Sequence, residues 1–307
     1  MSKRTILVVG SLNTDLVAKV DRFPDGGETI TGRNFSVHCG GKGANQAYAA
    51  SALGGSVAMI GQVGEDGFGA AQIANLSSAG VATAGILRDP KKETGTAFIG
   101  VDSSGENRII IVPGANGTLT PNQLQVECPL FQQASLLLLQ LETPLNTVAK
   151  AIKLGRMHKL TIILDPAPAA PLPDEWLESI DYLTPNLSEL NLLVGDSLVE
   201  TASIESITAS ARKLCTRGAR KIIGKLGSRG AVLVTPEATT YFPAPKVQAI
   251  DTTAAGDCFN AAFAIALDRG NTTHEAIRYA VAAASLSVTK AGAQSSMPSL
   301  EDLSNLE

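Results

Sequence analysis

The segment from Asp251 to Asp257, which reads DTTAAGD, combines a potential anion-binding turn with an acidic side chain. The small residues Ala254, Ala255 and Gly256 allow the backbone to approach a ligand closely, and a helix is predicted to begin there. The free N–H groups and positive dipole end of such a helix bind anions. Asp257 beside the anion could act as a general base, which contributes roughly 10²–10⁴ in rate. Alternatively Asp257 only complements the helix dipole, and this segment alone does not separate the two interpretations.

A second glycine-rich turn, GGKGAN, runs from Gly40 to Asn45 and precedes another predicted helix. It does not match the GxxxxGK[ST] pattern because Gly43 follows the lysine, and no GxGxxG follows a predicted strand. P-loop and dinucleotide-binding interpretations therefore lose support. Taken alone, this turn is weak evidence of a binding site, because glycines before a helix are common and a lysine such as Lys42 is usually a solvated charge.

Short apolar runs without alternation predict the strands that would position these turns, because such runs are typical of a parallel sheet covered on both faces. Between them lie helical patterns that end at Gly54, Gly80 and Gly270, each suited to a left-handed C-cap. A capping box at Thr272 and Glu275 predicts another helix over 273–289. We therefore predict an α/β fold with right-handed crossovers. The strands are predicted at 5–9, 56–60, 135–139, 161–164, 182–183 and 221–223, and the glycine-ended helices at 44–53, 68–79 and 258–268.

Two stretches fall outside this alternation. One is 16–37, rich in glycine between short mixed runs, and the other is 96–112, which reads as two strands joined by a turn. We expect a single α/β domain over 1–307 with a small β-lid inserted from about 12–38 and 96–112.

Ligands of open α/β sheets bind beyond the carboxyl ends of the strands. A lone polar residue there is usually a turn former or helix cap. Five predicted strands end this way, which favours a polar-lined cleft. The residues are Asn13, Asp15, Gln140, Glu142, Asp165, Asn186, Glu189 and the run from Lys225 to Gly230.

Composition excludes several classes of partner. The 307 residues carry a net charge of −4, which indicates no basic surface for nucleic acid or an anionic membrane. The four cysteines show no CxxC pairing, and the first apolar run is too short for a signal segment. We expect a cytoplasmic protein that binds neither nucleic acid nor membrane.

With both turns in place, the chain resembles the ribokinase branch of the PfkB carbohydrate kinases along essentially its whole length. The GGKGANQA motif from Gly40 to Ala47, continuing to Gly54 and Gly64, looks like the first signature of that family. DTTAAGD with Ala261 and Ala262 looks like the second. The resemblance implies a three-layer sandwich with a mainly parallel central sheet, plus a small β-sheet lid.

It also implies a sugar site and a catalytic centre. Asp257 would be the base that deprotonates the terminal sugar hydroxyl, and the N–H groups of Ala254, Ala255 and Gly256 would form an anion hole. The residues implied to contact the sugar are Asn13, Asp15, Gly41, Lys42, Asn45, Glu142 and Asp257.

ATP, Mg²⁺ and a monovalent cation, usually K⁺, are the implied cofactors. Asn186 and Glu189 match the NxxE element that orients Mg²⁺ and phosphates through water, which is consistent with magnesium keeping part of its hydration shell. Lys225, Gly227, Ser228 and Gly230 match a loop beside the nucleotide. Many ribokinases have threonine where Lys225 stands; this lysine could pair with a phosphate or extend to solvent. The implied K⁺ site comprises Asp251, Thr253, Ser287, Lys290, Gly292 and Ser296, with the Lys290 side chain directed outward.

The resemblance predicts D-ribose as the substrate, phosphorylated at its 5-hydroxyl. Kinases of other small sugars, especially 2-deoxyribose, stay open because one altered hydroxyl contact can redirect specificity. A nucleoside kinase is disfavoured by Lys42, and a dehydrogenase by the missing dinucleotide motif. A non-catalytic sugar-binding protein on the same fold is disfavoured by the intact Asp257. Unpaired lid edges favour a homodimer through the β-lid.

Overall fold

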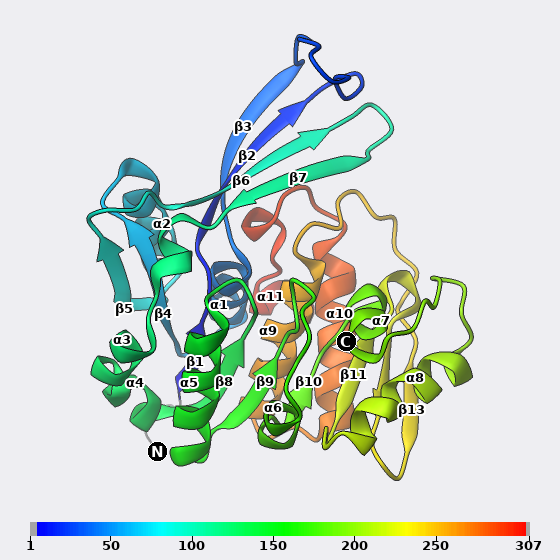
Figure 1. Cartoon of the computed structure of the whole chain (residues 1–307). Helices are drawn as coiled ribbons and strands as arrows, with labels where there is room; N and C mark the ends of the chain where they lie inside the picture. Colours follow the sequence, from blue (N-terminus) through cyan, green and yellow to red (C-terminus); the bar gives the residue numbers. More distant parts are fainter. Residues whose placement is uncertain (1–4, 305–307) are drawn as a thin grey trace.

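The computed structural model describes residues 5–304. Within this range a nine-stranded sheet runs in the order β13-β12-β11-β10-β9-β8-β1-β4-β5 (Figure 1). The strands from β11 to β5 are parallel to one another, whereas β12 and β13 are antiparallel additions at one edge. The bounds are β1 Thr5–Val9, β4 Val57–Gly64, β5 Ala82–Asp89, β8 Ala134–Leu139, β9 Thr161–Leu164, β10 Tyr182–Leu183, β11 Ile222–Lys225, β12 Ala231–Val234 and β13 Thr239–Phe242.

Helices cover both faces of this sheet, which produces two hydrophobic cores. Alternate residues of β1 supply the two sides: Ile6 and Val8 join the core under α1, α9 and α10, and Leu7 and Val9 join the core under α5 to α8. This double burial explains why the strands read as unbroken apolar runs. The helices are α1 Lys42–Ala52, α2 Gly67–Ser78, α3 Pro121–Val126, α4 Cys128–Gln133, α5 Leu145–Met157, α6 Asp174–Ser179, α7 Leu187–Val194, α8 Ile204–Thr216, α9 Ala255–Asp268, α10 Thr273–Ser287 and α11 Leu300–Ser304.

A separate four-stranded sheet has the order β3-β2-β6-β7 and projects from one end of the sandwich (Figure 1). Its strands are β2 Asn13–Lys19, β3 Asn34–Gly40, β6 Gly95–Val101 and β7 Asn107–Val112. The β2–β3 and β6–β7 pairs are antiparallel, and parallel pairing of β2 with β6 joins them into one sheet. The predicted fold class, a mainly parallel layered sheet with a small additional β-sheet, is confirmed.

The local signals mark where several helices begin and end. Gly54, Gly80 and Gly270 all have φ between 83° and 90°, in the left-handed region that glycine favours after a helix. Thr272 and Glu275 form the predicted capping box at the start of α10. The strands β5, β12 and β13 were not predicted.

Within residues 5–304, no helix is both long enough and apolar enough to cross a membrane.

Candidate active site

The two glycine-rich turns meet at Asp257. This residue lies in the first turn of α9, where Asn45 Nδ2 of α1 donates to its Oδ2 at 3.0 Å. Gln46 Nε2, also of α1, donates to Asp257 Oδ1 at 3.1 Å. Both oxygens of one buried carboxylate are therefore held by amide donors from a segment more than two hundred residues away.

The environment of Asp257 gives it the proton affinity of a weak base. Burial raises the pKa of Asp257 to about 6, and the charge of Asp165 acts in the same direction. Lys42 and the amide donors of Asn45 and Gln46 oppose this rise. At neutral pH the carboxyl group is thus mostly ionised, yet basic enough to accept a proton from a hydroxyl.

A cluster of carboxyl groups lies next to Asp257. Glu142 Oε2 accepts hydrogen bonds from Ser11 Oγ at 2.5 Å and from the Lys42 N–H at 3.2 Å. Burial raises the pKa of Asp15 to about 7, with further contributions from the charges of Glu142 and Asp257. Such a set of donors and acceptors suits the hydroxyl groups of an uncharged ligand.

Lys42 provides the positive charge in this cluster. Burial by itself lowers the pKa of Lys42, but the charges of Asp257, Asp165 and Glu142 together raise it above its ordinary value. The side chain therefore stays charged and faces the carboxylates, which contradicts the alternative of a solvated surface lysine.

The Gly41 to Gly43 turn can pack this closely only because it lacks side chains. Gly41 has φ of 89°, and a Cβ there would lie 2.6 Å from the N atom of Asn13. A Cβ at Gly43 would lie 2.6 Å from the carbonyl carbon of Gly10. The start of α1 thereby rests directly on the end of β1.

Asn13 is oriented by a residue without a predicted role. Asn116 Nδ2 donates to Asn13 Oδ1 at 2.8 Å, and Asn116 Oδ1 accepts from the Leu12 N–H at 2.9 Å. The bond from Asn116 to the side-chain oxygen of Asn13 thereby fixes the orientation of the Asn13 amide group.

The turn before α9 has the features of an anion site. Ala254 adopts φ of 59°, an uncommon conformation for a residue with a Cβ, and it forms the N-cap of α9. The first N–H groups of a helix have no partner within it. Lys225 Nζ lies beside this turn, since a Cβ built on Gly256 would be 3.5 Å from it. Backbone donors and an ammonium group thus converge at one place.

Lys225 does not extend into solvent. Its Nζ contacts Asp165 Oδ1 at 2.8 Å, and the two side chains are only 12% and 3% exposed. Asp165 Oδ2 also accepts from Gln46 Nε2 at 3.2 Å, so Lys225 is connected through Asp165 and Gln46 to Asp257. Sequence reasoning offered a phosphate contact or a solvent-exposed lysine, and the second alternative is wrong.

Asn186 and Glu189 also lie close to Lys225. They form a capping box at the start of α7, in which Glu189 Oε2 accepts from the Asn186 N–H at 2.7 Å. Asn186 also forms an isolated parallel bridge with Lys225. Burial raises the pKa of Glu189, while Lys225 opposes the rise.

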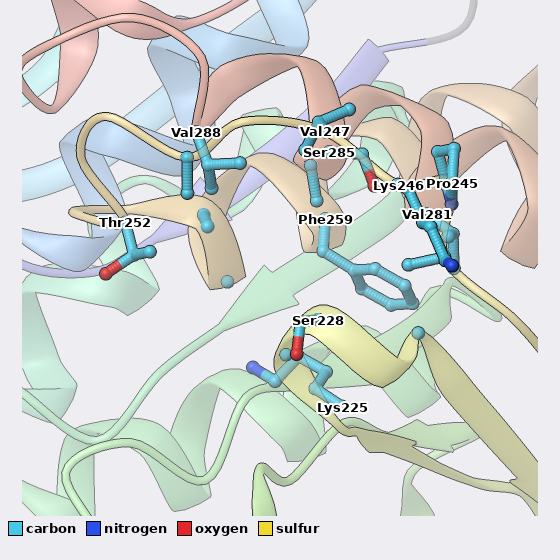
Figure 2. A pocket seen from close by; sticks show the side chains of 17 residues that line it. Lys225, Ser228, Pro245, Lys246, Val247, Thr252, Phe259, Val281, Ser285 and Val288 are labelled. Carbon is cyan, nitrogen blue, oxygen red and sulfur yellow. The ribbon is translucent and has the colours of Figure 1, made fainter.

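A cavity of about 580 Å³ opens beside the Lys225 loop and the start of α9 (Figure 2). In Figure 2 the Phe259 side chain lies between Lys225 and Ser228 on one side and Val281 and Ser285 on the other. Its mostly apolar walls and its position next to the anion turn suit a flat aromatic group carrying phosphates. The lining residues are Lys225, Gly227, Ser228, Gly230, Ala244, Pro245, Lys246, Val247, Ala249, Thr252, Ala255, Gly256, Phe259, Val281, Ala284, Ser285 and Val288.

Three of the predicted cation-site residues, Asp251, Thr253 and Gly292, are linked to one another by hydrogen bonds before this turn. Asp251 Oδ2 accepts from the Gly292 N–H at 2.8 Å, and Asp251 Oδ1 accepts from Thr253 Oγ1 at 2.6 Å. Ser287 and Ser296 are both buried. Lys290 Nζ lies 3.5 Å from Asp302 Oδ2, a contact on α11.

Several residues of this site had no role in the sequence-based prediction. Gln140 and Asp165 stood out only because they follow strands. Gln46 lay in the first signature without a function, and Asn116 and Gln294 carried no local signal. Their contacts join segments that are far apart in the sequence. Covariation between pairs of positions, rather than a local motif, could therefore have identified them.

Comparison with known proteins assigns the chain to a class. The family described as pfkB family carbohydrate kinase matches residues 3–300, a range that contains both turns and the strand-end residues. A protein named ribokinase from Haemophilus influenzae is 40% identical, with 98% of this chain and 97% of that protein covered. A protein named deoxyribokinase from Salmonella typhimurium is 37% identical, with 96% of each covered. A ribokinase structure from Arabidopsis thaliana, complexed with ribose and ATP, superposes with a TM-score of 0.92 at 34% identity, covering 99% of this chain and 98% of that one.

The fold and the matched range define a carbohydrate kinase. The chain belongs to the PfkB family, and its resemblance to the ribokinase branch is confirmed by these relatives. The predicted enzyme class is therefore confirmed.

Proposed function

We propose that this kinase transfers the γ-phosphate of ATP to the 5-hydroxyl of D-ribose. The observation that carries the proposal is the position of Asp257, between the Glu142 cluster and the anion turn that borders the apolar cavity. The relatives named ribokinase, and the neighbouring structure with ribose and ATP, support the same substrates.

In this mechanism the sugar lies among Asn13, Asp15 and Glu142, with Lys42 and Asn45 directed at its hydroxyl groups. Gly41 contributes its backbone at the same wall, where a side chain would collide with the Asn13 backbone. Asp257 accepts the proton of the 5-hydroxyl as that oxygen attacks the γ-phosphorus.

The leaving nucleotide occupies the cavity, with its base against Phe259 and its phosphates directed at the turn. The N–H groups of Ala254, Ala255 and Gly256 stabilise the charge on the transferred phosphoryl group. Lys225 contributes a positive charge beside them, and the loop from Gly227 through Ser228 to Gly230 borders the same cavity.

Magnesium fits the carboxylate and amide oxygens of Glu189 and Asn186, because each oxygen engaged in the capping box retains a second lone pair. A bound Mg²⁺ would offset the phosphate charges in a site that already holds several carboxylates. Glu189 would hold its hydration shell in place.

A monovalent cation fits the loop formed by Asp251, Thr253 and Gly292, together with backbone oxygens near Ser287, Lys290 and Ser296. The Lys290 ammonium group is engaged by Asp302, so it need not compete for this place. The cation would supply positive charge behind the anion turn. We expect markedly higher activity in K⁺ than in tetramethylammonium, and equal rates in both would remove the site from the mechanism.

The small sheet would cover the sugar and pair with a second copy of the chain. Its edge strand β7 carries exposed apolar side chains, including Ile109 at 51% and Ile110 at 68% exposure. An apolar edge strand of this kind favours association with another strand or sheet.

The decisive experiment measures ATP consumption with ribose, 2-deoxyribose, fructose and adenosine in the presence of Mg²⁺ and K⁺. A preference for 2-deoxyribose is the specific second candidate, because a deoxyribokinase is among the similar relatives. Asp257→Asn should fold and bind ribose while kcat falls by about 10²–10⁴, the usual contribution of a general base. Near-normal turnover by that variant would contradict the assignment.

A further inference from the structure

Asp257 stands at the end of a continuous chain of side-chain amides. Asn75 Nδ2 of α2 donates to Gln294 Oε1, and Gln294 Nε2 donates to Asn45 Oδ1 at 3.1 Å. Asn45 Nδ2 then donates to Asp257 Oδ2 at 3.0 Å. Asn75 donates on its nitrogen, and Gln294 and Asn45 each accept on the oxygen and donate on the nitrogen, so all three bonds run in one direction, towards the carboxylate.

The direction of this chain has a physical origin. An ionised carboxylate only accepts hydrogen bonds, so Asn45 must present its NH₂ group to Asp257. Its oxygen must then face Gln294, which is only 6% exposed and has to donate in turn. A reversed amide would place oxygen against oxygen inside the protein, where unpaired polar groups are costly. The orientations of the three amides are therefore interdependent.

We propose that Asn75 and Gln294 are positioning residues that act through Asn45 to keep Asp257 competent as a base. The inference rests on the proposed catalytic role of Asp257. Gln294 belongs to the segment that follows Gly292, so the same chain connects the Asp251 loop to the sugar pocket.

Other groups around Asp257 limit the size of the effect. Lys42 and Asp165 face it electrostatically, and Asp15 lies near enough to respond to its charge. Gln46 supplies a second donor, held in orientation by Gln140 Nε2, which donates to Gln46 Oε1 at 2.6 Å. This second arm is independent of Asn75. Disturbing the Asn75 arm should therefore shift the titration of Asp257 rather than abolish activity.

The test is Asn75→Asp, a change of nearly the same shape at the far end of the chain. An ionised aspartate accepts from Gln294 instead of donating to it, which reverses Gln294 and then Asn45 and turns the Asn45 oxygen towards Asp257. The acid limb of kcat/KM for ribose, measured at saturating MgATP between pH 5.5 and 9, should move upward by about one pH unit. Activity at pH 6 should fall roughly fivefold, because the ionised fraction of Asp257 drops from about one half to about one eleventh, with recovery towards the wild-type value at high pH.

Ser77→Asp is the matched control, because it adds the same charge to the exposed side of the same helix. It should leave the profile unchanged, which removes long-range electrostatics as the cause. Gln294→Glu is the second variant and should shift the limb in the same direction. Melting temperatures for all variants separate a folding defect from a displaced limb.

The outcomes separate this inference from the proposed function. Asp257→Asn could be inactive while Asn75→Asp and Gln294→Glu keep the acid limb of the wild-type pH profile. That result would support Asp257 as the base and overturn the positioning role of Asn75 and Gln294. A loss of activity that is equal at all pH values also overturns it. Near-normal turnover of Asp257→Asn would instead overturn the proposed base and this inference with it.

Discussion

Replacing Lys225 by methionine tests whether the buried Lys225–Asp165 pair contributes to stability as well as to nucleotide binding. The Nζ–Oδ1 distance is 2.8 Å and the Asp165 side chain is only 3% exposed. Methionine keeps most of the side-chain length and packs flexibly, so the main change is the loss of the ammonium group. Asp165 would retain the hydrogen bond from Gln46 at 3.2 Å.

Removing one partner of a fully buried pair costs about 3–5 kcal/mol. Because Lys225 lies at the wall of an open cavity, water partly compensates the remaining charge, and we expect a smaller cost of about 2–3 kcal/mol. The double variant Lys225→Met/Asp165→Asn removes both charges and should recover to within about 1 kcal/mol of the wild type. Urea unfolding of the unliganded protein at neutral pH gives these free energies.

Lys246→Met is the matched control, since it removes an exposed lysine from the same cavity without breaking a buried pair. Its unfolding midpoint should equal that of the wild type. The KM for ATP should rise about tenfold in Lys225→Met, from the loss of one charge-assisted contact to a phosphate. An unfolding midpoint of Lys225→Met equal to that of Lys246→Met would refute the argument for a stabilising buried pair.

Two further predictions concern titration and assembly. Because the pKa of Asp257 is raised to about 6 and the base must be ionised, kcat/KM for ribose should decline below about pH 6 and level off above pH 7; a profile without that decline would contradict the assigned base. The proposed dimer is tested by Ile110→Lys on the exposed strand β7, which should convert a dimer to a monomer in light scattering. Val126→Lys, at a similarly exposed position on α3, is the control and should leave the dimer intact. A dimer that persists in Ile110→Lys would exclude the β7 face from the interface.

The parts of the site that depend on local backbone chemistry could be predicted from the sequence. Small residues before a helical pattern predicted a turn at Ala254 to Gly256. In the structure Ala254 is the N-cap of α9, and Asp257 lies in the first turn of that helix. The glycines after α1, α2 and α9 and the capping box of α10 were identified for the same reason. The antiparallel pair β12 and β13 was missed. The edge strand β5 was also missed, because only two of its eight residues are buried and it does not read as an unbroken apolar run.

The pairing of remote segments could not be read from the sequence. Both lid segments were assigned to one small β-lid, but the sequence did not give the parallel pairing that joins them, in which Leu16 lies opposite Phe98. The Lys225 side chain shows the same limit. The residues next to it in the sequence are compatible with a solvent-exposed lysine, so they do not determine where its charge lies. Asp165, sixty residues away, determines where its charge lies.

What the sequence by itself determined is six of the parallel strands, four of the helices, the two turns and the chemical types of the residues at the strand ends, since these follow from periodic burial and local conformational preference. Only the tertiary structure decided which of those residues act on one another. The bond between Gln294 and Asn45 spans 249 positions, and the bonds to Asp257 from Asn45 and Gln46 span over two hundred. The basicity of Asp257 depends on burial and on neighbours brought together by folding, so it is a property of the packed protein rather than of any motif.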